Sequence, residues 1–427
     1  MNNIKLRLIA MNFLQFAVWG SYLTSMGTML AGLGLAKNIG IFYAMQGVVS
    51  LFMPAIIGII ADRKIQAQRL LGICHLLAAL FMAASAYVIS TASGTPNLNL
   101  LLTLYTFSVA FYMPTLALSN SVAYTALEKN GLDTVAAFPP IRVWGTVGFI
   151  CAMLVCDFAG FQATYMQFYQ SAILGIMLAG YALTLPTCPV NTSQDKRSFI
   201  DSFGLRAFAL FKQKKMAMFF IFSMLLGVSL QITNGFANLF ITSYESIPEY
   251  ADTFAAQHAN ALISLSQVSE TLCILLIPFF LKRFGIKIVM LIAMFAWVLR
   301  FGLFGVGNPG DGVWMFVLSM IVYGVAFDFF NISGSLFVNN ETDASIRSSA
   351  QGLFMIMTNG IGATLGTLGA QAVVDHHVFS QSSPMAMAEG WSTTWLIFAG
   401  YALVVALAFW VLFKYKHEPN KLTNIKH

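Results

Sequence analysis

The sequence predicts an all-α membrane protein whose twelve transmembrane helices form two pseudo-symmetric six-helix bundles. Of its 427 residues, 58% are hydrophobic and only 9% are charged, against about 25% charged residues in an ordinary soluble domain. Apolar segments of roughly 20 residues, long enough to cross the hydrocarbon core, recur along the whole chain. One polar segment divides them into two sets of six, as expected after an internal duplication.

Short loops join the predicted spans, with one exception. The expected limits are 6–34, 40–61, 70–91, 99–127, 140–163, 167–185, 215–244, 257–281, 287–305, 313–338, 350–374 and 392–415. The apolar part of the first span is too long for a secretory signal, so we expect it to be retained. The exception is the polar, basic segment 186–214, a predicted cytoplasmic linker between an N-terminal bundle (1–185) and a C-terminal bundle with a short cytoplasmic tail (215–427).

The basic residues indicate the orientation of the chain in the bilayer. Nearly all of them fall in loops or span ends that can face one side, and Lys37 is the only one in a loop on the other side. The positive-inside rule then predicts that both termini are cytoplasmic. The sequence pI of about 9.0 is therefore a topology signal, and we expect the lipid bilayer, not a nucleic acid, as the partner of these charges.

Neither the cysteines nor the histidines form a pattern that binds a metal. The five cysteines are scattered, without a Cys-x-x-Cys pair, and are expected to be buried thiols. We expect no metal and no cofactor. Inside the predicted spans, Pro54, Pro114 and Pro278 are potential helix breakers, and Gly362 with Gly366 forms a small-xxx-small pair that allows close helix approach.

Asp328, Glu270 and Arg142 interrupt three of the apolar spans. Arg300, near the far end of the ninth span, is expected to be an interhelical or snorkelling residue rather than a ligand. Each such group costs at least about 2.5–3.5 kcal/mol to insert, and such residues usually handle an ion or a substrate. Loss of water favours the neutral form of a carboxyl group, whereas a nearby arginine favours the charged form, so a carboxylate that alternates between the two could carry a proton. We therefore predict proton coupling by Glu270 and Asp328, with Arg142 as a partner. A static buried ion pair remains the alternative.

Polar and aromatic residues recur at helical spacing on four spans, consistent with side chains that face one cavity. These candidate substrate-binding residues are Arg142, Thr146 and Phe149 on the fifth span, Gln231 and Asn234 on the seventh, Gln267 and Glu270 on the eighth, and Tyr323, Phe327 and Asp328 on the tenth. Amides, hydroxyls and flat phenyl rings suit a neutral solute with a planar ring and several hydroxyls, such as a nucleoside. A sugar remains an alternative, and single amides could also serve as interhelical hydrogen bonds.

The stretches LQFAVWGSYLT, FPPIRVWGTVGF, FFIFSMLLG, LQITN, SQVSETL, IVYGVAFDFFNISGSLFV and FKYKHE closely resemble the bacterial nucleoside:H+ symporter family, within the major facilitator superfamily. The segment from Gly58 to Arg63 also resembles the G-x-x-x-D-R loop motif of that superfamily, although Ile65 and Gln66 replace its usual basic continuation. The resemblance extends from the first span to the last. It is weakest in the central loop, around 375–391 and in the tail.

The resemblance implies proton-driven uptake of purine and pyrimidine nucleosides across the bacterial inner membrane, by alternating access and without enzymatic activity. All ten candidate residues match the family pattern, in which these positions contact the base and ribose and the two carboxylates are needed for transport. We expect a monomer. Uptake of sugars or other hydroxylated solutes is the alternative, and a polytopic membrane enzyme is disfavoured because no nucleophile or metal set stands out.

Overall fold

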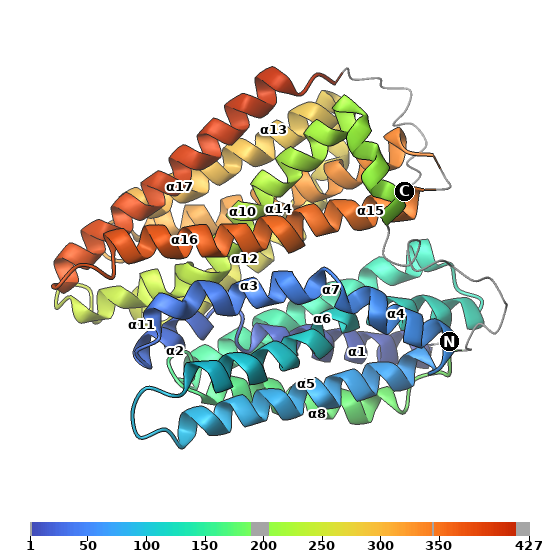
Figure 1. Cartoon of the computed structure of the whole chain (residues 1–427), viewed down its shortest axis with the longest axis horizontal. Helices are drawn as coiled ribbons and strands as arrows, with labels where there is room; N and C mark the ends of the chain where they lie inside the picture. The colour runs from blue at the N-terminus through green and yellow to red at the C-terminus, as the bar shows by residue number, and fades with distance from the viewer. Residues whose placement is uncertain (1, 189–204, 344–345, 416–427) are drawn as a thin grey trace. The chain divides into compact units, whose positions relative to one another are not determined.

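The computed structural model describes residues 2–188, 205–343 and 346–415, and every regular element in these ranges is a helix (Figure 1). The predicted cytoplasmic tail and most of the predicted linker 186–214 fall outside these ranges. The chain divides into two compact units. Unit 1 comprises Met1–Arg197 and Asn234–Leu239, and unit 2 comprises Ser198–Thr233 and Phe240–His427.

Unit 1 is built from helices that pack pairwise through apolar faces. They are α1 (Asn2–Gly20), α2 (Met26–Gly32), η1 (Ala36–Asn38), α3 (Ile39–Ser50), α4 (Met53–Arg63), α5 (Ala67–Ser90), α6 (Leu98–Lys129), α7 (Thr134–Phe158) and α8 (Met166–Ala182). Helix α1 packs on α7 and α8. Helix α5 packs on α6 and α8, and α5 and α8 run side by side in Figure 1. Leu8, Leu71 and Val122 are fully buried in one core cluster of this unit.

The ends of several helices in unit 1 follow from local chemistry. The side chain of Asn97 caps α6 by accepting a hydrogen bond from the backbone N–H of Leu100 at 3.0 Å. Gly131 and Gly160 follow α6 and α7 with φ of 66° and 72°, a left-handed conformation that side chains disfavour. Asn97 therefore marks the start of α6, and Gly131 and Gly160 mark the places where the chain turns back after α6 and α7.

The first two predicted spans are each broken into two helices. Residues 21–25 form turns between α1 and α2, and the hydroxyl of Ser21 donates to the Ala17 carbonyl at 2.9 Å. Residues 36–50 and 53–61 form a pair bent by 40°. Pro54 lies in the first turn of α4, where its missing N–H costs nothing. The apolar pattern predicted these spans but not their breaks.

Unit 2 contains the helices of the C-terminal half, except that Asn234–Leu239 of α10 groups with unit 1. They are η2 (Leu205–Lys212), α10 (Lys214–Ser243), η3 (Tyr244–Ser246), α11 (Phe254–Gln257), α12 (Ala259–Ile274), α13 (Ile277–Val306), α14 (Val313–Glu341), α15 (Arg347–Met355), η4 (Ile356–Gly362), α16 (Ala363–His377) and α17 (Pro384–Leu412). Helix α13 packs on both α14 and α17, and α12 packs on α14. This packing places α14 between two neighbours.

The boundary between the predicted eighth and ninth spans differs from the structure. The eighth was expected to run to residue 281, but α12 ends at Ile274 and α13 begins at Ile277, with Pro278 in its first turn. Helix α13 then continues through Gly285, which has φ of 79° and kinks the helix where a loop was expected. Hydropathy does not mark the break after Ile274, which lies in an apolar run, and the basic residues Lys282, Arg283 and Lys287 favoured a loop where α13 continues.

A π-helical segment joins α15 to α16. This segment, η4, places Gly362 at its end and Gly366 one turn later. A side chain on either glycine would collide with the backbone of α10, at Met224 and Val228 respectively. The predicted close helix approach at this glycine pair is confirmed.

Among the described residues, eight helices are long and apolar enough to cross a membrane, or nine if the bent pair α3–α4 counts as one span. Large apolar side chains on the outer surfaces agree with a lipid environment. Ile173 and Met177 on α8, and Val404 and Trp410 on α17, are all more than half exposed. The chain is a multi-pass, all-helical membrane protein.

Candidate functional site

The predicted residues of the fifth span lie on one face of α7. Arg142, Thr146 and Phe149 follow at helical spacing. Helix α7 approaches α1 closely at Gly148, where an added Cβ would lie 2.8 Å from the carbonyl carbon of Phe13 and 2.9 Å from its Cα. The position of the α7 face is therefore set by backbone-to-backbone packing on α1.

Two aromatic side chains of α1 support this face. The guanidinium carbon of Arg142 lies 3.9 Å from the ring centroid of Phe16, a cation–π contact. The ring of Trp19 meets Phe149 edge to face at 6.3 Å. Sequence reasoning did not select Phe16 and Trp19. Their spacing of three residues was the available signal, and it does not reveal which helix they contact.

Trp19 is itself held by a buried glutamine. Its indole N–H donates to Oε1 of Gln46 at 3.3 Å, and Nε2 of Gln46 donates to the hydroxyl of Tyr105 at 2.7 Å. Gln46 is 2% exposed; its bond to Tyr105 is buried and its bond to Trp19 is partly buried. Buried amides with satisfied partners fix the orientation of their neighbours. Gln46 thus fixes Trp19, which packs against Phe149.

A second glutamine connects three helices in the core of unit 1. Nε2 of Gln15 on α1 donates to the hydroxyl of Thr115 on α6 at 2.7 Å. Its Oε1 lies 2.7 Å from Nε2 of His75 on α5, and its backbone carbonyl accepts from the hydroxyl of Tyr112 at 2.8 Å. These hydrogen bonds form a network that links α1 to α5 and α6 in the core of unit 1.

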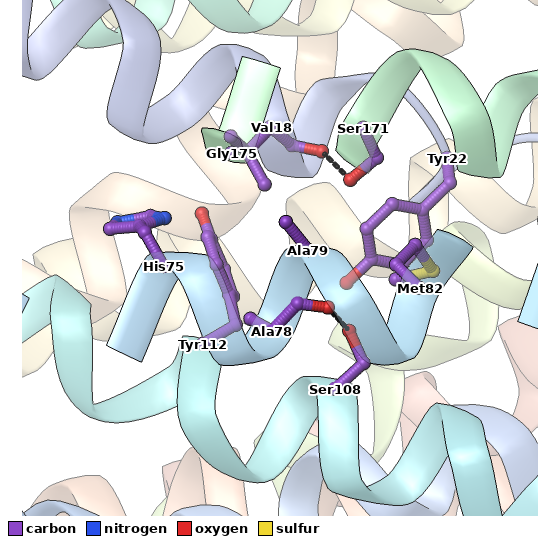
Figure 2. A pocket seen from close by; sticks show the side chains of 10 residues that line it. All are labelled: Val18, Tyr22, His75, Ala78, Ala79, Met82, Ser108, Tyr112, Ser171 and Gly175. Atoms are coloured by element: carbon purple, nitrogen blue, oxygen red, sulfur yellow. Dashed lines mark hydrogen bonds between the residues drawn. The ribbon is translucent and has the colours of Figure 1, made fainter. Parts of the chain in front are cut away.

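A small cavity lies beside this network (Figure 2). Its volume of about 10 Å³ has room for about one water molecule and none for an organic solute. In Figure 2, Ser171 and Ser108 donate to the carbonyls of Val18 and Ala78, both at 2.8 Å. The cavity is part of the packing of unit 1 and cannot itself hold a substrate.

The three predicted residues of the tenth span lie on α14 in unit 2. The rings of Tyr323 and Phe327 are parallel, with centroids 5.7 Å apart and planes inclined by 4°. Tyr323 is 6% exposed and Asp328 only 5% exposed. Helix α14 therefore carries a flat aromatic pair next to a buried carboxyl group.

Helix α12 brings a second carboxyl group to α14. The two helices cross at Gly324, where an added Cβ would lie 2.6 Å from the backbone carbon of Ser269. Glu270 follows directly on α12, and the phenol of Tyr323 interacts electrostatically with both Glu270 and Asp328. The close contact between α12 and α14 thus lies one residue from Glu270 and one residue from Tyr323, and Asp328 follows one turn later on α14.

The predicted amides have different surroundings. Gln231 on α10 is buried in unit 2. Asn234 belongs to a segment of α10 that groups with unit 1. Gln267 is half-buried on α12. The candidate residues are thus distributed over both units: Arg142, Thr146, Phe149 and Asn234 in unit 1, and Gln231, Gln267, Glu270, Tyr323, Phe327 and Asp328 in unit 2.

Sequence reasoning gave Arg300 an interhelical or snorkelling role rather than a ligand role. The interhelical expectation is confirmed, because the side chain is 2% exposed and donates to the Ser319 carbonyl at 2.6 Å. The structure adds a contact that was not expected. The guanidinium carbon lies 4.6 Å from the ring centroid of Tyr323.

The cysteines are free thiols, and Cys273 lies at the crossing of α12 and α14, with its sulfur 3.7 Å from the Ser269 hydroxyl. Cys74, Cys156, Cys188 and Cys273 are buried as expected, but the expectation is wrong for Cys151, which is exposed on α7. In the described ranges, no three His, Cys, Asp or Glu side chains are grouped as a metal site requires. The candidate site offers hydroxyls, amides, aromatic rings, two carboxyl groups and an arginine.

Sequence comparison finds relatives of nearly the same length. The chain is 49% identical over 420 residues to the nucleoside permease NupG of Escherichia coli strain K12, with 97% of each protein covered. It is 46% identical over 430 residues to the xanthosine permease of the same organism, with 100% of this chain and 99% of the relative covered.

Structural comparison agrees with the sequence. The crystal structure of the nucleoside transporter NupG matches with a TM-score of 0.88 at 47% identity, covering 97% of this chain and all of that one. A POT family transporter matches with a TM-score of 0.67 at 12% identity, which shows a shared fold alone. The model of the nucleoside H+ symporter family matches residues 1–418. The chain belongs to the nucleoside H+ symporter family.

Proposed function

We propose that this protein takes up nucleosides together with protons, by alternating access of one binding site to the two sides of the membrane. The observation that carries the proposal is the family match over residues 1–418, together with near full-length relatives named for nucleoside and xanthosine transport. The side chains of the candidate site supply the donors, acceptors and ring faces that a nucleoside requires.

The proposed architecture is twelve spans in two six-helix bundles, residues 1–185 and 215–427, joined by the linker 186–214. Four short or broken stretches supply the spans that do not stand out as single long helices: α1 with α2, α3 with α4, α8 and α12. The distribution of basic residues supports cytoplasmic termini, and the family supports a place in the bacterial inner membrane. One chain carries all ten candidate residues, which supports a monomer as the functional unit.

For the nucleoside, we propose two kinds of contact. Phe149 and Phe327 offer flat faces for the base, and Thr146 and Tyr323 offer hydroxyls for the base or ribose. The amides of Gln231, Asn234 and Gln267 add donors and acceptors to the same site. The rigid mounting of Phe149 and Tyr323 in their units supports this role, because preorganised side chains lose less entropy when a ligand binds.

For the proton, we propose Glu270 and Asp328 as carriers, with Arg142 as a partner that favours the charged carboxylate in one state. The burial of Asp328 supports this assignment, since a charge there is costly and protonation removes the cost. One charge moving inward across about 100 mV yields about 2.3 kcal/mol, which can concentrate a neutral solute about 50-fold.

The test is accumulation of labelled uridine and adenosine in proteoliposomes under an inward proton gradient. We expect the wild type to accumulate both and Asp328→Asn to lose uphill accumulation. Asp375→Asn is the matched control, because that carboxylate accepts from Gln371 at 2.7 Å near the end of α16, away from the candidate residues. Uphill accumulation by Asp328→Asn would refute the coupling role, and failure of the wild type to transport any nucleoside would refute the function.

The alternative cargo is a sugar or another hydroxylated solute. A maltose permease from Geobacillus stearothermophilus is 24% identical over 299 residues, covering 69% of each protein. That likeness is weaker and shorter than those to the nucleoside and xanthosine permeases, which favours nucleosides. A thermal-shift competition between uridine and maltose discriminates the two. Stabilisation by the disaccharide alone would favour the alternative.

A further inference from the structure

Arg300 on α13 is a positive charge enclosed in unit 2 that the proposed mechanism does not use. Its Nη1 donates to the Ser319 carbonyl of α14 at 2.6 Å and to the hydroxyl of Ser266 on α12 at 3.4 Å. The Ser319 hydroxyl donates back to the Arg300 carbonyl at 3.0 Å. Three helices thus hold the guanidinium through backbone and hydroxyl groups. Since a buried charge at membrane depth is costly, its retention points to a role beyond packing.

The guanidinium covers one face of Tyr323. Its central carbon lies 4.6 Å from the ring centroid, within the range of a cation–π interaction that strengthens when water is excluded. The ring of Trp297 meets Tyr323 edge-on at 6.0 Å and 89°. Phe327 lies parallel to it at 5.7 Å. Tyr323 is therefore held by three neighbours in one orientation.

The position of Arg300 also has an electrostatic consequence. Tyr323 interacts with Arg300, Glu270 and Asp328. The phenol thus lies in the field of one permanent cation and two carboxyl groups. A change in the orientation of the Tyr323 ring would change the electrostatic interaction of its hydroxyl with Glu270 and with Asp328.

We propose that Arg300 is a positioning residue for nucleoside recognition, which holds the Tyr323–Phe327 pair in its ligand-binding orientation through the cation–π contact. This inference rests on the proposed function, because it takes Tyr323 as a ligand contact. Arg300 does not itself touch the nucleoside. Its loss therefore weakens binding only as long as the tyrosine is present.

The experiment is a double-mutant cycle on purified protein, with nucleoside affinity measured by calorimetry and corrected for the folded fraction. The probe is uridine. We expect Arg300→Gln to weaken uridine binding about tenfold or more, and to raise KM more than it lowers the maximum rate. In a Tyr323→Leu background, the same substitution should change affinity by less than about twofold. Ser266→Ala removes the longer hydrogen bond of the guanidinium, together with the bond from the Ser266 hydroxyl to Sδ of Met320 at 3.1 Å, and should stay within about twofold of the wild type.

A lower melting temperature with unchanged uridine affinity of the folded fraction would assign Arg300 a purely structural role and overturn the proposal. An equal loss of affinity with and without Tyr323 would also overturn it. If Arg300→Gln gives no monodisperse protein, Arg300→Lys replaces it, with an expected loss of about threefold and a wild-type affinity as the contradicting result. Absence of nucleoside binding by the wild type would instead refute the proposed function.

Discussion

Gly148→Ala tests whether the contact between α1 and α7 positions the arginine and phenylalanine of the candidate site. An alanine Cβ would lie 2.8 Å from the Phe13 carbonyl carbon, against the 3.4 Å at which ordinary contact begins. The Phe13 carbonyl oxygen would lie closer still, so the helices must separate locally by more than about 0.6 Å. Such overpacking typically costs about 1–3 kcal/mol, and the helix propensity of alanine returns at most about 1 kcal/mol. We expect a net loss of about 1–2 kcal/mol, because the obstructing atoms are backbone and cannot rotate away.

The assay combines thermal unfolding in detergent with uridine uptake in proteoliposomes. Gly180→Ala on α8 is the matched control, since no heavy atom of a neighbour lies within 4 Å of its added Cβ. This control should be neutral or slightly stabilising, with normal uptake. Gly148→Ala should unfold earlier and lose uptake as Phe149 is displaced. Equal stability and uptake of the two variants would refute the argument that backbone contact sets the position of α7.

Three further predictions concern stability and reactivity. Glu341→Gln breaks a 2.6 Å ion pair with Lys215, in which the side chain of Glu341 is 19% exposed and that of Lys215 is 41% exposed. The substitution should lower the free energy of unfolding by less than about 1 kcal/mol. High salt should reduce the difference between variant and wild type. Gln15→Met removes the side-chain hydrogen bonds of Gln15 to Thr115 and His75 and should cost about 1–3 kcal/mol in the same unfolding assay, whereas an unchanged stability would contradict the network. Burial raises the pKa of the Cys188 thiol. Maleimide should therefore label this thiol more slowly in the native protein than in denatured protein, and the labelling rate should increase as the pH rises. Equal rates in native and denatured protein would contradict the burial of Cys188.

The apolar pattern predicted the helical membrane class because length and hydropathy are read directly from sequence. It could not place the break after Ile274, which interrupts an apolar run, or the kink at Gly285, where the neighbouring Lys282 and Arg283 favoured a loop. A break there depends on which neighbour the chain packs against. The prolines were a mixed signal: Pro54 and Pro278 lie in the first turn of a helix, whereas α6 continues through Pro114.

The candidate residues that carry polar groups were visible in sequence because such groups are rare in an apolar helix. The residues that hold these side chains in place could not be identified from the sequence. Phe16 and Trp19 resemble any other aromatic residues of a span, and their role depends on contact with Arg142 and Phe149 across α1 and α7. Arg300 was noticed as a charge, but the ring that it covers is on another helix. Spacing along one helix does not identify partners on the next.

The π-helical segment η4 alters the phase of the span that contains it. One additional residue in a helical turn rotates everything that follows by about 100° relative to an uninterrupted α-helix. Counting by 3.6 across Ile356–Gly362 therefore assigns the later side chains to the wrong face. Removal of a single residue from this segment would swing Gly366 away from α10 and present a bulkier neighbour to its backbone. The alignment of this helix with α10 thus depends on chain length as much as on residue identity.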